Sequence, residues 1–386
     1  MDHPPDRSVL SALVGDIDQF NELTWGRRPM HRATGQTFEH LLSIERIEAL
    51  LLAGARRPTF RLVQEGVTLP AERSTRPLRL GGRRLEDVAD VETIADALHG
   101  GATLVLQGLQ RTSTELAEFC RSLERAAGHP VQANAYLTPA RSTGLAAHSD
   151  EHDVFVLHVL GKKQWHVEGI GEVSLEAGDV LYIPTGAKHS ASTQQGLSLH
   201  LTIGMLSVTY GAAMRRLLDR EGAEELRRPL PLGYAHDDAA ALSESMQSAA
   251  RRAAQALLDA DPMAAAQREM SSALGRRRPR PVGHLRSVLE LDRFDLNSWI
   301  RLRHDAHAVV DPVDTVTDTI RLHLVGRRLT LPAAMGPAVD RLMTGEPVQV
   351  GQLPALSDQG RFVLIRRLLR EVVIEEVEPP PGRGTS

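Results

Sequence analysis

Short apolar runs separated by turn residues constrain the fold of this chain more than any other feature of its sequence. Between residues 131 and 210, glycine, proline, serine and aspartate separate apolar runs at 131–137, 154–160, 164–167, 180–183 and 197–203. Each run has the length of one β-strand, and closely spaced short strands are typical of a sandwich or barrel. We therefore expect a β-barrel in the middle of the chain.

Helical patterns precede and follow the expected barrel. An apolar stripe predicts a helix over 114–127, with Thr112 and Glu115 forming a capping box at its start. Cys120 belongs to this stripe, so we interpret it as a core residue and not as a nucleophile. After the barrel, apolar residues recur at helical intervals over 211–290.

The length of 386 residues favours two to three domains. Near the C-terminus, strands at 319–324 and 372–377 enclose helices over 335–343 and 358–370, which is a winged-helix-like pattern. The fold class is α+β. Its predicted segments are N-terminal α/β elements packing on the barrel at 1–90, the barrel domain at 91–210, a helical segment at 211–290, a winged-helix-like domain at 295–378 and a disordered tail at 379–386.

Charge and cysteine content exclude several function classes. A net charge of −4 gives no basic field to hold nucleic acid or an anionic membrane. Residues 309–377 contain eight arginines against nine acids, which argues against DNA binding by the winged-helix-like domain. Cys120 is the only cysteine, so any metal needs histidine and carboxylate ligands. The sequence has neither a signal pattern nor a membrane-length apolar run, and we expect a cytoplasmic protein.

A histidine followed two residues later by an acid is a candidate metal-binding pair, because residues i and i+2 of an extended segment share a face. The chain contains three such pairs, which begin at His148, His166 and His236. A third ligand from another strand would complete a 2-His-1-carboxylate set, which leaves positions open on Fe(II). Such pairs also arise by chance, so the surrounding sequence has to discriminate among them.

The run 176–189 provides that context. A turn at Gly178 leads into a short apolar strand, and a second turn at Pro184 precedes His189. This hairpin pattern returns a histidine to the mouth of the expected barrel, where it can meet one of the three pairs.

The motifs of the barrel form one set, which consists of Gly144 and the runs 134–139, 148–150, 153–155, 161–165, 178–189 and 198–204. This set resembles the JmjC-type cupins of the ribosomal oxygenase group. The resemblance implies a double-stranded β-helix (cupin) barrel, followed by an α-helical dimerisation segment and a winged-helix domain. It also implies an Fe(II)- and 2-oxoglutarate-dependent oxygenase that acts on ribosomal proteins.

The resemblance assigns the catalytic iron to His148, Asp150 and His189. It assigns the distal carboxylate of 2-oxoglutarate to Lys163. The chemistry of a diacid agrees with this assignment, because a carboxylate that enters a dry barrel needs a cation at its far end.

Lysine is scarce in this chain, since only three of its 45 lysines and arginines are lysines. All three lie within the stretch 162–188. Lys163 and Trp165 share one face of their strand, whereas Lys162 faces away and is interpreted as solvated. Lys188 is interpreted as a charged turn residue.

Asn134 and Tyr136 match positions near the cosubstrate and substrate in the family. His200 shares a strand face with Ser198 and Thr202 that is expected to line the barrel interior, which makes it a further candidate binding residue. Their residue types leave alternatives open: a satisfied core amide, a core aromatic and a hydrogen-bonded core histidine. Three other histidines of the barrel are interpreted as structural, namely His152, His158 and His166.

The segment 166–177 departs from the family, because it is shorter than the insertion expected there. We expect a short loop that leaves the barrel mouth open to a chain segment. The predicted function is hydroxylation of a side chain in a protein or peptide by an arginyl or histidyl hydroxylase that forms a homodimer. The alternatives are a tailoring hydroxylase of a biosynthetic peptide or small metabolite, and a non-catalytic metal-binding cupin.

Overall fold

The structure is a computed structural model, and it describes residues 7–140, 142–143, 146–193, 196–221, 226–236, 239–275, 283–303, 306, 308–311, 313–324 and 327–380. Gly144, the acids of the pair that begins at His236, and the tail from residue 381 lie outside the described residues. The chain divides into two compact units, Met1–Thr209 and Tyr210–Ser386. Each unit is described by itself.

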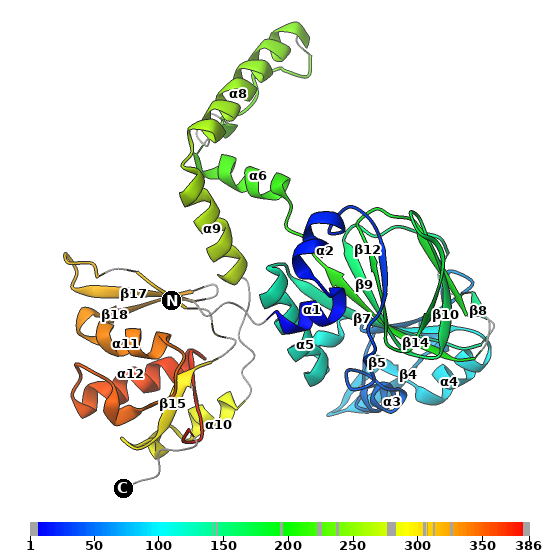
Figure 1. The fold of residues 1–386 in the computed structure, drawn as a ribbon, viewed down its shortest axis with the longest axis horizontal. Coiled ribbons are helices and arrows are strands. Elements are labelled where there is room, and N and C mark those ends of the chain that lie inside the picture. The colour runs from blue at the N-terminus through cyan, green and yellow to red at the C-terminus, as the bar shows by residue number, and fades with distance from the viewer. Residues whose placement is uncertain are drawn as a thin grey trace. The chain divides into compact units, whose positions relative to one another are not determined.

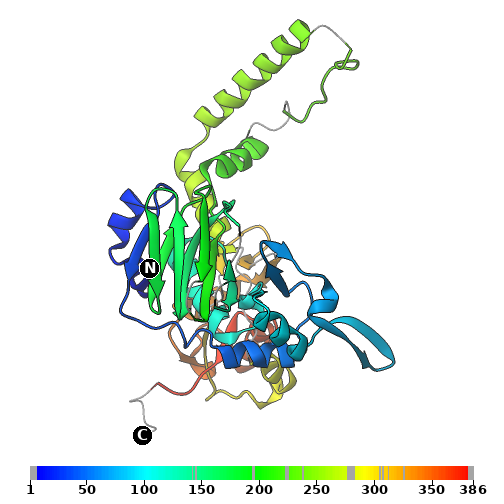
Figure 2. The same cartoon turned by 90° about the vertical axis from the view of Figure 1, so that its right-hand side faces the viewer.

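Two antiparallel sheets form the barrel of the first unit (Figure 1). The eight-stranded sheet has the order β1 (Met30–Ala33), β12 (Asp179–Ile183), β9 (Asp153–Leu160), β14 (Ser198–Met205), β7 (Val131–Thr138), β6 (Thr103–Leu106), β2 (Phe60–Gln64) and β3 (Val67–Thr68). The four-stranded sheet has the order β11 (Gly171–Glu176), β10 (Lys162–Val167), β13 (His189–Thr193) and β8 (Ser142–Thr143). This arrangement confirms the predicted cupin barrel. Figure 2 shows the same unit from the side of the smaller sheet.

The two faces of the eight-stranded sheet serve different purposes. On β14, Leu199, Leu201 and Ile203 are fully buried in a large apolar core that also includes the helices α1 (Ser8–Val14) and α5 (Thr114–Ala127). The alternate residues of β14 face the other sheet, because successive side chains of a strand point to opposite faces. The barrel interior therefore receives the polar side chains of this strand.

Helix α5 has the predicted bounds, but a different residue caps it. Ser113 is extended and its hydroxyl accepts a hydrogen bond from the backbone N–H of Leu116 at 3.3 Å. The predicted cap, Thr112, instead donates its hydroxyl to the carbonyl of Leu109. The capping box was therefore placed one residue too early. Cys120 is buried, and burial raises the pKa of its thiol to about 12, which confirms a core role.

The segment 166–177 is a hairpin and not the expected loop. Strands β10 and β11 pair from Lys162 opposite Glu176 to Val167 opposite Gly171. Polar and apolar residues alternate along β11, so its apolar side chains, such as Leu175, are directed into the barrel core. The prediction of a loop at this position is wrong.

The remaining elements of the first unit lie mainly before the barrel strands. They are α2 (Ile17–Leu23), α3 (Ile44–Leu52), α4 (Val91–His99) and a ribbon of β4 (Thr75–Leu80) and β5 (Arg83–Ala89). No helix in the described part of the chain is long and apolar enough to cross a membrane.

The second unit begins with helices and continues into a small α/β body with its own apolar core. The helices are α6 (Tyr210–Glu221), α8 (Ala239–Asp259), α9 (Pro262–Gly275) and α10 (His284–Leu289). The α/β body contains the helices α11 (Gly336–Met343) and α12 (Asp358–Arg370). One of its sheets has the strand order β19 (Val348–Gln349), β15 (Trp299–Leu302) and β20 (Ile374–Glu376). The other sheet has the order β16 (Val309–Val310), β17 (Thr319–Leu324) and β18 (Arg327–Pro332).

Candidate metal and cosubstrate site

The backbone holds the three predicted metal ligands together. His148 and His189 form an isolated antiparallel bridge, in which each backbone N–H donates to the carbonyl of the other residue at 3.0 and 2.8 Å. The carbonyl of Asp150 accepts a hydrogen bond from the N–H of Gly186 at 2.9 Å. The start of β13 is thereby fixed against the segment that carries the His-x-Asp pair.

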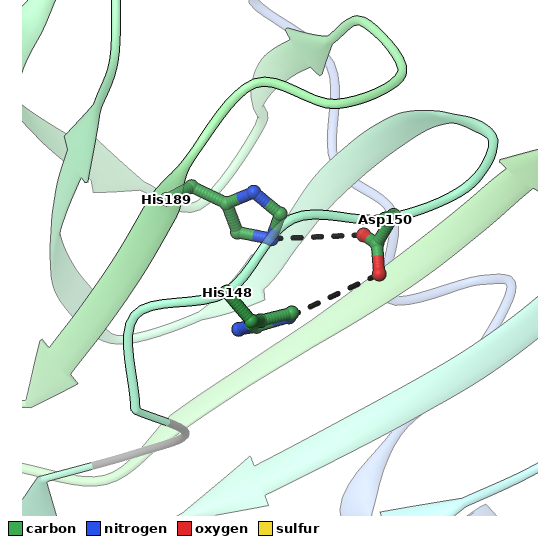
Figure 3. A group of neighbouring side chains, drawn as sticks. All are labelled: His148, Asp150 and His189. Carbon is green, nitrogen blue, oxygen red and sulfur yellow. Dashed lines mark ion pairs between the residues drawn. The ribbon is translucent and has the colours of Figure 1, made fainter.

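The side chains of the three ligands converge on one point (Figure 3). His189 Nε2 lies 3.6 Å from Asp150 Oδ2, and His148 Nε2 lies 3.9 Å from Asp150 Oδ1. The three ligand atoms all lie within 4.8 Å of one another. These separations are too long for direct hydrogen bonds, but they suit atoms that each bind one shared ion at about 2.0–2.2 Å.

Both histidine rings are oriented by a second hydrogen bond. Nδ1 of His148 lies 2.8 Å from the carbonyl oxygen of Ala146, and Nδ1 of His189 lies 3.0 Å from that of Ala187. A carbonyl can only accept, so each Nδ1 carries the proton and each Nε2 presents a lone pair towards Asp150. Burial lowers the pKa of His189, which favours the neutral, ligating ring.

The pair that begins at His166 forms no comparable cluster among the described residues. His166 is exposed and its Nδ1 lies 2.9 Å from Glu172. The acids that follow His236 lie outside the described residues. Within the described ranges, His148, Asp150 and His189 are the one group of three histidine, cysteine or acidic side chains close enough to hold a metal.

The three ligands line a cavity that is open to solvent. Side chains from both sheets form its wall: Thr103, Asn134, Tyr136, His148, Asp150, His152, Val154, Val156, Lys163, Trp165, Ile183, His189, Ala191, His200 and Thr202. The structure therefore brings all seven predicted site residues to one cavity.

Lys163 is a buried cation in the wall of this cavity. Its side chain is 3% exposed, and Nζ donates to the hydroxyl of Thr138 at 3.0 Å. No carboxylate of the described residues forms an ion pair with it, and burial lowers its pKa to about 7. Lys162 points to the opposite face and pairs with Glu176 at 2.8 Å, as the strand alternation predicted.

Asn134, Tyr136 and His200 line the same cavity. Asn134 Oδ1 accepts a hydrogen bond from the backbone N–H of Gly108 at 3.0 Å. The Tyr136 and His200 rings stack at 4.9 Å with an interplanar angle of 3°, and Trp165 meets His200 edge-on at 5.4 Å. Burial, followed by the charge of Lys163, keeps the pKa of His200 well below its usual range. His200 is therefore a neutral ring, and its buried Nδ1 has no partner in the described structure.

Sequence reasoning missed three polar residues of this site. Thr138 holds Lys163, and Thr103 donates to the Thr138 hydroxyl at 3.3 Å. His152 lines the cavity, although it was interpreted as structural. His158, in contrast, is a buried residue behind His200, where its Nε2 lies 3.1 Å from the carbonyl oxygen of Gly161.

Comparison with known proteins identifies the barrel. A family model described as a JmjC domain matches residues 106–171 and 167–212. The chain is 34% identical over 166 residues to the bifunctional lysine-specific demethylase and histidyl-hydroxylase NO66 of Dictyostelium discoideum. The matched region covers 35% of this chain and 32% of that protein. It is 30% identical over 256 residues to ribosomal oxygenase 1 of Gallus gallus, which covers 56% of this chain and 41% of that protein. The chain thus spans less than half the length of these relatives.

Solved structures with the same fold include YcfD, a ribosomal oxygenase from Escherichia coli. Its complex with cobalt and succinic acid has a TM-score of 0.53 at 15% identity and covers 94% of this chain and 99% of that one. Its complex with cobalt and 2-oxoglutarate has a TM-score of 0.51 at 15% identity and covers 94% of this chain and 99% of that one. The barrel therefore matches a JmjC domain and has the fold of these solved structures.

Proposed function

We propose that this chain, whose barrel is a JmjC domain similar to those of the ribosomal oxygenases, is an Fe(II)- and 2-oxoglutarate-dependent oxygenase. One observation carries the proposal: a preorganised 2-His-1-carboxylate cluster shares its cavity with a buried lysine that has no carboxylate partner in the described structure. The cluster suits a divalent iron with open coordination positions. The lysine suits the far end of a dicarboxylate.

His148, Asp150 and His189 would hold the metal, since both imidazoles already present Nε2 and the carboxylate lies between them. When bound, Fe(II) would supply the redox chemistry that couples O₂-dependent conversion of 2-oxoglutarate to succinate and CO₂ with hydroxylation of a C–H bond. The protein supplies fixed ligand geometry and a cavity wall that orients both organic substrates.

Lys163 and Thr138 would bind the distal carboxylate of 2-oxoglutarate. The ammonium has donors to spare after its bond to Thr138, and an anion would relieve the cost of its burial. Asn134 and Tyr136 alternate with Thr138 on one face of β7, and His200 is paired with Tyr136 on β14. All three line the cavity, and we assign them to the body of the cosubstrate. A non-catalytic metal-binding cupin would not need this cation.

The second substrate is proposed to be a histidyl or arginyl side chain of a protein or peptide. The relatives support a polypeptide substrate, because one is named a histidyl-hydroxylase and another a ribosomal oxygenase. A further 177 residues follow the barrel unit, which is more than a small-molecule oxygenase needs. A biosynthetic peptide belongs to the same chemical class, whereas a free metabolite would contradict this part of the proposal.

The second unit is proposed to serve assembly. Several large apolar side chains on its helices are exposed in the single chain, including Met246, Leu258, Met263 and Met270. We propose that residues 211–290 form a homodimer interface and that 295–378 act as a winged-helix-like domain without DNA binding. The need for ferrous iron and 2-oxoglutarate agrees with a cytoplasmic enzyme.

The experiment that tests the substrate class uses lysate of a strain from which the gene is deleted. The lysate is incubated with the enzyme, Fe(II) and 2-oxoglutarate, and its peptides are searched by mass spectrometry for the gain of one oxygen. We expect modified histidyl or arginyl peptides. A purified metabolite that gains oxygen while no peptide does would contradict the polypeptide assignment.

A further inference from the structure

His152 is a cavity residue that the proposed metal and cosubstrate sites do not use. It lies two positions after Asp150 and lines the same cavity. Its ring occupies space that a side chain on Gly204 of β14 would fill. A Cβ at Gly204 would come within 2.6 Å of His152 Nε2 and 2.7 Å of its Cδ2. The φ angle of Gly204 lies outside the left-handed region, so the ring of His152 requires glycine here and the backbone does not.

A hydrogen-bonding group orients this ring. Gln132 is paired with Gly204 on the neighbouring strand β7, and its Nε2 lies 3.4 Å from His152 Nε2. An amide nitrogen donates, so the imidazole Nε2 accepts and Nδ1 carries the ring proton. Nδ1 has no hydrogen-bond partner among the described residues. The arrangement thus leaves one N–H donor for a bound molecule.

The position of His152 indicates which molecule it meets. Gln132 and Thr138 are six residues apart on β7, which places them about 20 Å apart along the strand. Thr138 and Lys163 define the end of the cavity assigned to the cosubstrate carboxylate. The ring of His152 meets Gln132 and Gly204 at the opposite end of β7 from Thr138, so it does not contact a carboxylate held at Lys163. Its ligand is therefore the molecule that is to be oxidised.

We propose that His152 is a substrate-binding residue whose Nδ1–H donates a hydrogen bond to a main-chain carbonyl oxygen of the polypeptide substrate. A peptide carbonyl is the acceptor that every residue of such a substrate offers to a neutral N–H donor. This inference rests on the proposed function and deepens it, because it names a contact that holds the substrate at the metal end of the cavity.

The test uses synthetic peptides that each carry one central histidine or arginine, with full-length enzyme, Fe(II) and 2-oxoglutarate. His152→Phe keeps a ring but removes the donor, Gly204→Ala displaces the ring, and His152→Asn restores a donor near the position of Nδ1. His166→Ala, on the exposed face of β10, is the matched control. Thermal unfolding of each variant verifies that it folds.

We expect His152→Phe and Gly204→Ala to lower kcat/KM for the peptide by about three- to tenfold, the loss of one neutral hydrogen bond. Succinate released per hydroxylated peptide should rise. His152→Asn should recover part of the loss, and His166→Ala should match the wild type.

Three results would separate the possible failures. Folded His152→Phe enzyme with wild-type peptide kinetics and coupling would overturn the role of His152. Wild-type enzyme that converts 2-oxoglutarate but oxidises no peptide would overturn the carbonyl contact and leave the oxygenase proposal intact. Wild-type enzyme that converts no 2-oxoglutarate would overturn the proposed function itself.

Discussion

Replacing Lys163 with methionine tests the assignment of the cosubstrate pocket. Burial lowers the pKa of Lys163 from the ordinary lysine value of 10.5 to about 7. At 1.36 kcal/mol for each pKa unit, holding the ammonium in this site costs on the order of 5 kcal/mol in the ligand-free protein. A carboxylate beside the ammonium would recover much of that free energy on binding.

The pH dependence has a definite sign. The folded-state pKa of Lys163 is lowered, so between pH 7 and the ordinary lysine range the unfolded chain binds more protons than the folded one. The free energy of unfolding of the ligand-free protein should therefore rise as pH increases through this window. Binding of 2-oxoglutarate should raise the pKa of Lys163. The complex should then take up close to one proton above pH 7, and its affinity should fall as pH increases.

The assay is calorimetric titration of 2-oxoglutarate in two buffers of different ionisation enthalpy, with Mn(II) or Co(II) in place of iron. We expect Lys163→Met to lose proton uptake and to weaken binding by at least about a hundredfold, equivalent to about 3 kcal/mol. The ligand-free variant should be as stable as the wild type or more stable, because an apolar side chain replaces an unpaired buried charge. Lys162→Met removes the exposed ion pair with Glu176 and should change the affinity for 2-oxoglutarate little. Wild-type affinity and proton uptake in Lys163→Met would refute the assignment.

Three further predictions concern activity, stability and assembly. Asp150→Ala should abolish succinate production while its circular dichroism stays that of the wild type, and residual turnover near the wild-type rate would contradict its role as a ligand. Gly161→Ala should lower the free energy of unfolding by more than about 2 kcal/mol in a denaturation assay, because the φ angle of Gly161 is +76° and a Cβ would meet the carbonyl oxygen of Leu197 at 1.9 Å. Gly171 has a φ angle of +74° but open space around it, so Gly171→Ala should lower the free energy of unfolding by less. Sedimentation of the wild type should give about twice the chain mass of 42.2 kDa. Met246→Glu, on the exposed face of α8, should weaken the dimer, and a wild-type monomer would contradict the assembly proposal.

Local sequence signals predicted those elements whose pattern is strong and self-contained. The strand at 319–324 and the helix at 358–370 have the predicted bounds, because alternation in the one and a serine cap in the other mark their ends. The cap of α5 was misplaced because Thr112 and Ser113 are adjacent capping residues, and only the backbone conformation selects between them. Strand β11 was missed because its alternation lies in a segment that was interpreted as a short loop.

The candidate site was predictable where spacing alone places side chains. The His-x-Asp pair, the histidine that begins β13 and the two faces of β10 all follow from neighbours in sequence. Thr138 and His152 required the register between strands, because Thr138 meets Lys163, and His152 packs over Gly204, only once β7, β9, β10 and β14 have assembled. A single sequence does not state which strands pair, so these contacts appear only in the structure.

The most direct test of the proposed oxygenase is anaerobic absorption spectroscopy of the full chain titrated with Fe(II) and then with 2-oxoglutarate. Chelation of ferrous iron by 2-oxoglutarate in the cavity should produce a visible charge-transfer band that saturates at one equivalent of iron per chain. Admission of O₂ should bleach the band as succinate forms. His148→Ala should not produce the band, whereas His166→Ala should. A wild-type protein that shows no band with both ligands present, or an undiminished band in His148→Ala, would contradict the account.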